Sequence, residues 1–326
     1  MAKITILGAG GWAMALAILS NNRGHNVTMW TPFENEIEIL NTTRGNEKLL
    51  PGVKLPEAIA FSTDISVAEN SELTIMAVPS HAVRSAAQKL KAVKNPGIIV
   101  DVAKGFDKQN LLRLSEVIKQ ELPNAEVVAL SGPSHAEEVA LGVPTSLVAA
   151  SENLPAAEIV QNALYGPEMR IYTTDDVVGV EIGGAIKNVI AICVGICTGM
   201  GLGDNSKAAL MTRGLAEMTR LSVCMGGKQH TLAGLTGIGD LIVTCTSQHS
   251  RNNRFGMLVG KGVPVKEALS TVGTVEGYYA AELAYTLAKK YRIEMPIVEA
   301  CYGVLYNGQN IKDCVNSLMC RPNIRE

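Results

Sequence analysis

KITILGAGGWA, residues 3–13, is the stretch that decides the fold of this chain. A β-branched run leads into a glycine-rich turn and an apolar helical pattern, and a second β-branched run follows. We therefore expect a strand, a helix and a strand at 3–7, 12–20 and 26–30. With Gly8, Gly10 and Ala13 in the turn, this order predicts the opening βαβ unit of a dinucleotide-binding fold. Gly8 permits the tight turn, and Gly10 lets a pyrophosphate approach the amides that begin the helix.

Strand and helix patterns continue to alternate as far as Thr173. Further strands are expected at 73–78, 98–102, 127–130, 145–150 and 169–173. Such alternation predicts a Rossmann-type, doubly wound, mainly parallel sheet with helices on both faces. From Val177 onward the patterns are only helical, which predicts an all-α second domain. We place the dinucleotide-binding domain at 1–178 and the helical substrate and catalytic domain at 179–326.

The composition narrows the classes of protein to consider. A net charge of −2 without charged blocks argues against nucleic acid as a partner. Seven cysteines without paired spacing indicate reduced thiols and no metal site, as in a cytoplasmic protein. Glycines at 8, 10 and 11 interrupt the apolar N-terminus, so it is not a signal peptide. The apolar run 189–202 is too short to cross a bilayer, so we expect no integral membrane segment.

The segment 181–195 is an apolar, glycine-rich helix pattern with a lysine at its centre. Small residues there let other backbones approach closely, and Lys187 and Asn188 share one face with Gly184. Burying an unpaired ammonium costs several kcal/mol, so its presence needs a reason. Either Lys187 reaches solvent or pairs with Glu181, or it is a catalytic amine at the domain junction, with a pKa lowered by a dry site.

Other polar residues follow strands or interrupt apolar helices. Lys104 and Ser134 come just after predicted strands, at the sheet edge where ligands bind, and we expect Ser134 to cap a helix. Asp240 and Thr244 stand one turn apart in an apolar segment, which makes them candidate catalytic residues beside Lys187 and Lys104.

Ser250-Arg251-Asn252 has the donors that suit a phosphate, because a guanidinium binds in bidentate fashion and the hydroxyl and amide add neutral bonds. The alternative is a solvated basic turn. After the second strand stand Trp30, Thr31 and Pro32, where an acidic ribose ligand is usual. Neither an acid nor an arginine distinguishes NAD from NADP, so either cofactor is expected.

Several long motifs in order resemble the bacterial NAD(P)-dependent glycerol-3-phosphate dehydrogenase family. They are GAGGWAMALA at 8–17, VPSHA at 78–82, AKG at 103–105, SGPSHAEEVALGVPT at 131–145, GGAIKNVIAI at 183–192, GLGDNSKAALMTRGLAEMTRL at 201–221, GLTGIGDLIVTCTSQHSRNNRFG at 234–256, VEG at 275–277 and EMPI at 294–297. The chain departs from the family pattern at Gly11, where serine is usual, at Ala13-Met14 and at Pro32.

The resemblance implies reduction of dihydroxyacetone phosphate to sn-glycerol 3-phosphate for phospholipid synthesis. Lys187 matches the proton donor and acceptor, and Lys104 the second lysine, in contact with substrate and cofactor. The implied substrate-binding residues are Lys104, Gly132, Ser134, Lys187, Asn188, Asp240, Ser250, Arg251 and Asn252. The cofactor contacts that the resemblance implies are Gly11, Trp12, Lys104, Ala136, Arg251 and Glu276. Gly8 and Gly10 of the glycine-rich turn complete the expected cofactor site.

Two other functions stay open on the sequence. A two-domain hydroxy-acid dehydrogenase has a similar plan, and the Arg251-Asn252 phosphate cluster argues against it. A nucleotide-binding regulator without turnover is the other, and the altered loop at Gly11 is its only support. Base rates for soluble proteins favour a homodimer.

Overall fold

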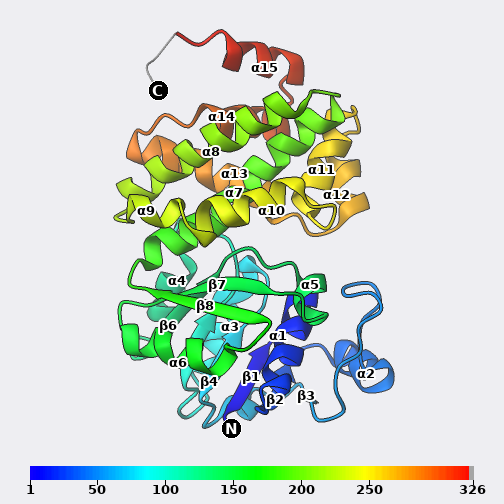
Figure 1. Cartoon of the computed structure of the whole chain (residues 1–326), viewed down its shortest axis with the longest axis vertical. Helices are drawn as coiled ribbons and strands as arrows, with labels where there is room; N and C mark the ends of the chain where they lie inside the picture. The colour runs from blue at the N-terminus through cyan, green and yellow to red at the C-terminus, as the bar shows by residue number, and fades with distance from the viewer. Residues whose placement is uncertain (323–326) are drawn as a thin grey trace. The chain divides into compact units, whose positions relative to one another are not determined.

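The computed structural model describes residues 1–322, which form two compact units, one of residues Met1–Glu181 and one that begins at Ile182 (Figure 1). The predicted fold class is confirmed: an eight-stranded, mainly parallel sheet with helices makes the first unit, and helices make the second. The domain boundary at 178/179 stays a prediction.

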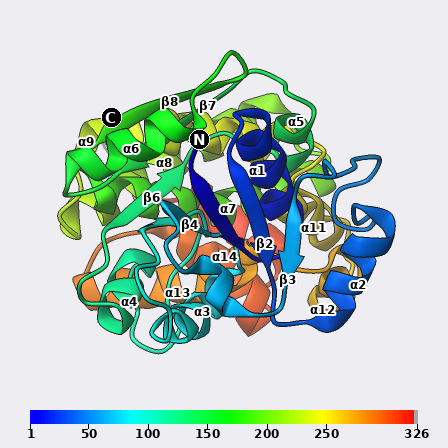
Figure 2. The same ribbon diagram turned by 90° about the horizontal axis from the view of Figure 1, so that it is seen from below.

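The sheet runs in the order β3-β2-β1-β4-β5-β6-β7-β8. Its strands are β1 Lys3–Leu7, β2 Asn26–Trp30, β3 Ala60–Ser62, β4 Leu73–Met76, β5 Ile98–Asp101, β6 Val127–Ser131, β7 Thr145–Ala150 and β8 Met169–Thr174. All neighbouring pairs are parallel except β6 and β7. The chain builds the sheet outward from β1 in both directions, with β2 on one side of β1 and β4 on the other (Figure 2). Sheets of this kind bind ligands at such a switch point.

Two apolar clusters hold helices to the sheet. One includes α1 and α6, and the other α3 and α4. The helices of this unit are α1 Gly11–Asn22, α2 Glu34–Thr43, α3 Val83–Leu90, α4 Leu114–Glu121, α5 Ala136–Ala140 and α6 Leu154–Leu164, with short turns η1 Ile65–Ala68 and η2 Ser80–Ala82.

Two local expectations were incomplete or wrong. Strand β3 was not predicted, because three residues are too few to show an alternating pattern. Ser134 does not cap α5: His135 precedes that helix, and the Ser134 hydroxyl donates to the Gly132 carbonyl at 3.0 Å.

The second unit is built around α7 Val177–Gly199, which begins in the first unit. The other helices are α8 Asp204–Cys224, α9 Gln229–Leu232, α10 Asp240–Thr246, α11 Arg251–Gly260, α12 Val265–Val272, α13 Glu276–Tyr291, α14 Pro296–Asn307 and α15 Ile311–Met319, with a wider turn η3 Leu235–Gly239.

Helix α7 is longer than the sequence indicated. The apolar run 189–202 alone is too short to cross a bilayer, yet the helix that contains most of it has 23 residues and is long and apolar enough to cross one. That length argument was wrong. Most of the helix is buried inside the protein, which is the pattern of a core helix, and no other helix of residues 1–322 meets both criteria.

Glycines bring α7 and α11 into backbone contact. A Cβ placed on Gly195 or Gly199 would lie 2.2 Å from the Asn253 carbonyl oxygen or 2.3 Å from that of Met257. A glycine of α11 also lies against the backbone of α7, because a Cβ on Gly256 would lie 2.1 Å from the Ile192 carbonyl oxygen. The prediction that small residues of the 181–195 segment admit another backbone is therefore confirmed at Gly195.

We expect Gly256→Ala to destabilise the protein by about 1–3 kcal/mol or more, because the added methyl group meets a backbone oxygen that cannot move aside alone. Chemical denaturation measures the change. Gly203→Ala is the matched control, since a Cβ there meets nothing within 4 Å, and it should cost at most about 1 kcal/mol. Equal effects of the two variants would contradict this view of the helix crossing.

Candidate active site

The turn between β1 and α1 has the shape of a phosphate cradle. Gly8 has φ +123°, and a Cβ on it would lie 2.4 Å from the Ala77 carbonyl oxygen at the end of β4. Only glycine fits there. By contrast, a Cβ on Gly10 would meet nothing within 4 Å, so there is open space above the first residues of α1. This space, at a helix N-terminus and at the switch point of the sheet, fits the pyrophosphate of a dinucleotide.

The structure around residue 11 explains why glycine stands where the family usually has serine. A Cβ at this position would lie 2.6 Å from the Leu49 carbonyl oxygen and 3.8 Å from the Cβ of Ala136. The chain around Leu49 occupies the place of the missing side chain, so the departure is accommodated. Ala13 and Met14, the other departures in this loop, are buried in the core of the first unit.

Lys104 and Gly132 meet at the carboxyl ends of neighbouring parallel strands. Lys104 follows β5, Gly132 follows β6, and the Lys104 Nζ donates to the Gly132 carbonyl oxygen at 3.0 Å. The Ser134 hydroxyl donates to the same oxygen. Gly132 has φ +139°, a conformation that favours glycine. The three residues form one polar group at the sheet edge.

Buried acids lie behind this turn. Asp101, at the end of β5, accepts the Ala103 amide hydrogen at 3.1 Å and so shapes the chain leading to Lys104. Burial, together with the nearby Glu181 carboxylate, raises the pKa of Asp101 well above its usual range. Glu181 accepts bonds from Arg113 at 2.6 Å and from the Ser115 amide and hydroxyl. These hydrogen bonds hold Glu181 against the start of α4, a pairing that the sequence did not predict.

Lys187 is buried and paired. It is 5% exposed, and its Nζ contacts the Asp240 carboxylate and donates to the Thr244 hydroxyl at 2.7 Å. Asp240 and Thr244 lie one turn apart on α10. The alternative pairing of Lys187 with Glu181 is wrong. Because an opposite charge stabilises an ammonium in a dry place, Asp240 compensates for the burial of Lys187.

Gly183 explains how α7 and α10 come so close. A Cβ on Gly183 would lie 2.4 Å from the Thr236 carbonyl oxygen, in the wide turn η3 that leads directly into Asp240. Any larger side chain would push η3 away from α7. The glycine therefore fixes the distance between Lys187 and its carboxylate partner.

Cys245 lies beside this ion pair. Burial raises the pKa of its thiol to about 12; the Lys187 ammonium opposes this rise, and the Asp240 carboxylate adds a smaller one. The thiol is thus neutral at physiological pH, and it is not a nucleophile here.

Three segments of the second unit meet at Asn252. Its Nδ2 donates to the Asn188 Oδ1 at 2.9 Å, and its Oδ1 accepts the Gly277 amide hydrogen at 2.9 Å. Asn252 therefore fixes the orientation of the Asn188 amide, next to Lys187, and the first turn of α13, next to Glu276. Gly277 was not singled out from the sequence, because its contribution is a backbone amide.

Ser250 and Arg251 begin α11. The buried Ser250 hydroxyl accepts the Asn253 amide hydrogen at 3.2 Å, so it caps this helix. Arg251 is exposed in the first turn. Asn253, also missed from the sequence, donates to the Cys245 carbonyl at 2.9 Å and ties α10 to α11.

The candidate residues thus form two sets. The first unit holds the glycine turn with Trp12 and Ala136, and also the Lys104 group. The second unit joins Lys187 to Asp240 and Thr244, and Asn188 to Asn252. Among residues 1–322, no cluster of three or more His, Cys, Asp or Glu could hold a metal ion.

A dinucleotide-binding sheet together with a buried lysine–aspartate pair defines a class, the nicotinamide-dependent dehydrogenases with a helical catalytic unit. Family comparison agrees. The N-terminal part of NAD-dependent glycerol-3-phosphate dehydrogenase matches residues 3–157, and its C-terminal part matches residues 176–316. The chain belongs to this family and is an NAD(P)-dependent oxidoreductase.

Individual relatives agree along the whole chain. Glycerol-3-phosphate dehydrogenase (NAD(P)+) of Desulfitobacterium hafniense is 49% identical over 328 residues, covering 100% of this chain and 93% of the relative. The enzyme of that name from Clostridium perfringens strain SM101 is also 49% identical, covering 100% and 99%. The crystal structure of glycerol-3-phosphate dehydrogenase from Coxiella burnetii superposes with a TM-score of 0.94 at 37% identity, covering 98% of this chain and 99% of that one.

Proposed function

We propose that this protein reduces dihydroxyacetone phosphate to sn-glycerol 3-phosphate with NADH or NADPH, and that the product feeds glycerophospholipid synthesis. The observation that carries the proposal is the buried Lys187, paired with Asp240 and Thr244, in a chain whose relatives bear this activity in their names. The bound nicotinamide supplies the hydride. The reaction then needs one proton and a positive charge at the ketone oxygen.

Lys187 is the group that meets this need. As hydride reaches the ketone carbon, negative charge grows on the ketone oxygen, and an ammonium beside it stabilises that charge and gives the proton. Asp240 and Thr244 orient the Nζ through the contacts described above. Lys104, Gly132 and Ser134 in the first unit, and Asn188, Ser250, Arg251 and Asn252 in the second, are the proposed ligands of the substrate.

Cofactor binding is assigned to the open space above Gly10 and its surroundings. Gly8, Gly10, Gly11, Trp12 and Ala136 belong to this region, and Lys104, Arg251 and Glu276 are the further proposed contacts. At the ribose end, directly after β2, Thr31 and Pro32 stand where an acidic or a basic side chain would choose between the two cofactors.

The test is an absorbance assay of reduced nicotinamide with dihydroxyacetone phosphate, run in parallel with NADH and NADPH. We expect turnover with this substrate and comparable rates with the two cofactors. Turnover only with a 2-keto or 3-keto acid would place the protein among hydroxy-acid dehydrogenases, and nucleotide binding without any turnover would make it a regulator. Either result would overturn the proposal.

We expect Arg251→Ala to raise the KM for dihydroxyacetone phosphate about 10- to 100-fold, because a charge-assisted bond to phosphate is worth about 1.5–3 kcal/mol. Steady-state kinetics measures it. Arg254→Ala, also exposed on α11 and one turn further on, is the matched control and should leave KM within about twofold. An unchanged KM in Arg251→Ala would remove the phosphate role from this side chain.

The proposal also covers the cellular compartment and the oligomeric state. The seven cysteines are all free in the structure, which suits a reducing cytoplasm. The protein is proposed to be a homodimer, and its small-molecule substrate needs no macromolecular partner.

A further inference from the structure

The fold brings a carboxylate to the end of β2, where the sequence has only Thr31 and Pro32. The Thr31 side chain is 2% exposed, and its hydroxyl donates a hydrogen bond to the Oε2 atom of Glu36. Glu36 stands in the first turn of α2 and is half-buried. Figure 2 shows α2 beyond β3, at one edge of the sheet. An acid from a neighbouring helix is therefore held beside the first residue after the strand.

This position lies next to the glycine turn of the first unit. Trp30, the last residue of β2, is paired in parallel register with Leu7, the last residue of β1. The Trp30 carbonyl oxygen accepts the Gly8 amide hydrogen at 2.7 Å, so Thr31 follows its strand at the same sheet edge as the glycine turn. When a dinucleotide places its pyrophosphate at this turn, an acid at the end of the second strand binds the hydroxyls of the adenosine ribose.

The segment that carries Glu36 has only negative charges. It contains Glu34, Glu36 and Glu38, and between Thr31 and Thr43 there is neither lysine nor arginine. Two of these acids stand in the first turn of α2, where carboxylates compensate the partial positive charge of a helix N-terminus. A 2′-phosphate on the ribose would therefore meet repulsion here, whereas a neutral hydroxyl would find a hydrogen-bond acceptor.

Arg44, the first basic side chain after this segment, is bound to other groups. Its guanidinium donates to the carbonyl oxygens of Pro56 and Ile59 and lies over the Phe61 ring, 4.5 Å from the centroid. Only 19% of the Arg44 side chain is exposed. These contacts hold the guanidinium in the loop after α2, so it does not offset the negative charge beside Thr31.

We propose that Glu36 is a specificity-determining residue of the cofactor site, which accepts the ribose hydroxyls of NADH and repels the 2′-phosphate of NADPH. Thr31 orients the carboxylate through its hydroxyl. The inference rests on the proposed cofactor site above Gly10 and refines it. The nicotinamide end is the same in both cofactors, so the two turn over at comparable rates when saturating. The preference therefore lies in the dissociation constant and the KM.

Titration of nicotinamide fluorescence on the whole chain tests this preference without turnover. We expect the wild type to bind NADPH with a dissociation constant at least about tenfold higher than that of NADH, the size of one charge interaction near a protein surface. Glu36→Gln keeps an accepting oxygen and loses the charge. It should lower the constant for NADPH about tenfold and leave that for NADH within about threefold.

Glu38→Gln is the matched control, because it makes the same change of charge at an exposed position of the same helix. It should alter neither constant by more than about twofold, and thermal unfolding shows that both variants are folded. A wild type that binds NADPH as tightly as NADH, or a Glu36→Gln variant with the wild-type preference, would overturn the role of Glu36 alone. If neither cofactor bound to the wild type, the proposed cofactor site would fall with it.

Discussion

Lys187→Ala is expected to lower kcat by about 10³-fold or more while nucleotide binding survives. The side chain supplies both the proton and the positive charge at the ketone oxygen, and these contributions are each worth about 10²- to 10³-fold or more. Rapid kinetics with dihydroxyacetone phosphate measures kcat, and titration of reduced nicotinamide fluorescence measures binding of the cofactor.

The substitution also leaves Asp240 buried without its cation, which can cost about 3–5 kcal/mol. Lys187→Met combined with Asp240→Asn removes both charges and keeps the volume, so it separates loss of chemistry from loss of folding. Lys261→Ala, at the end of α11 away from the buried pair, is the control and should keep full activity. Near-normal kcat in a folded Lys187 variant would falsify the assignment.

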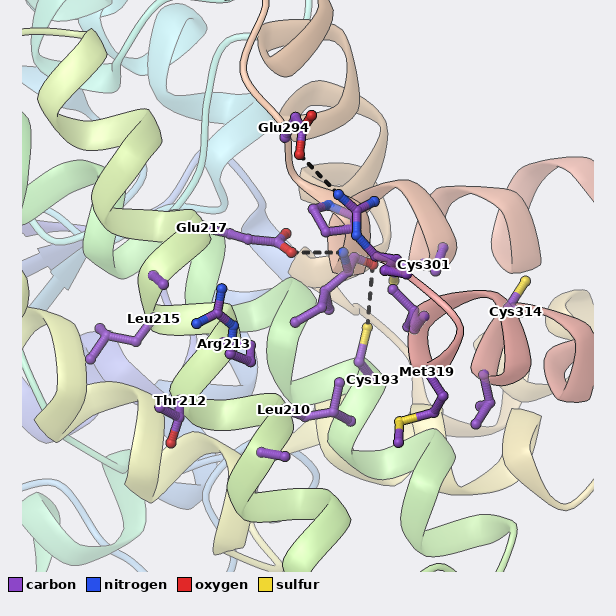
Figure 3. Close-up of a pocket in the computed structure, with 18 of the residues that line it drawn as sticks. Cys193, Leu210, Thr212, Arg213, Leu215, Glu217, Glu294, Cys301, Cys314 and Met319 are labelled. Carbon is purple, nitrogen blue, oxygen red and sulfur yellow. Dashed lines mark hydrogen bonds and ion pairs between the residues drawn. The ribbon is translucent and has the colours of Figure 1, made fainter. Parts of the chain in front are cut away.

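The second large effect concerns Glu217 and the pH dependence of stability. This carboxylate is 1% exposed on α8, and it accepts the amide hydrogens of Ile297 at 2.8 Å and of Val298 at 3.1 Å, at the start of α14 (Figure 3). Burial raises the pKa of Glu217 from 4.5 to about 7, although these two bonds and Arg220 oppose the rise and Glu299 adds to it.

The sign follows from the direction of this shift. Below about pH 4.5 the carboxyl group is neutral in the folded and unfolded protein, so it adds no cost. Between 4.5 and about 7 the unfolded chain ionises first, and the free energy of unfolding falls as the pH rises. The difference of about 2.5 pH units corresponds to a loss on the order of 3 kcal/mol at higher pH.

Glu217→Gln is expected to remove this slope, because the amide stays neutral while its oxygen still accepts an amide hydrogen. Urea denaturation at a series of pH values from 4 to 8 measures the free energy of unfolding in both proteins. Glu267→Gln, at an exposed carboxylate of α12, is the control and should keep the wild-type slope. A variant curve parallel to that of the wild type would show that Glu217 does not titrate in this range.

Local patterns were sufficient for the first half of the fold. The β-branched run before Gly8 and the repeated alternation of strand and helix predicted the parallel sheet, since burial on both faces leaves continuous apolar strands. Strand β3 and the reversed direction of β7 were not accessible, because a short edge strand carries little pattern and strand direction depends on where the connection returns.

The site shows the same division. A lysine in an apolar helix was recognisable as exceptional from its neighbours, and Asp240 and Thr244 stood out for the same reason. Nothing local distinguished Glu181 from Asp240 as the partner of Lys187. Two tertiary contacts make Asp240 the partner. Gly183 leaves room for the turn before Asp240 to approach α7, and Arg113 forms an ion pair with Glu181.

The sequence by itself determined the two-part organisation, the dinucleotide-binding turn and the exceptional status of Lys187, because each depends on residues close together in the chain. Tertiary structure alone decided that Lys187 meets Asp240 and Thr244, that Asn252 orients Asn188, and that Leu49 occupies the space beside Gly11. These contacts join residues that the fold brings together, and their distances depend on how closely glycines let the backbones approach.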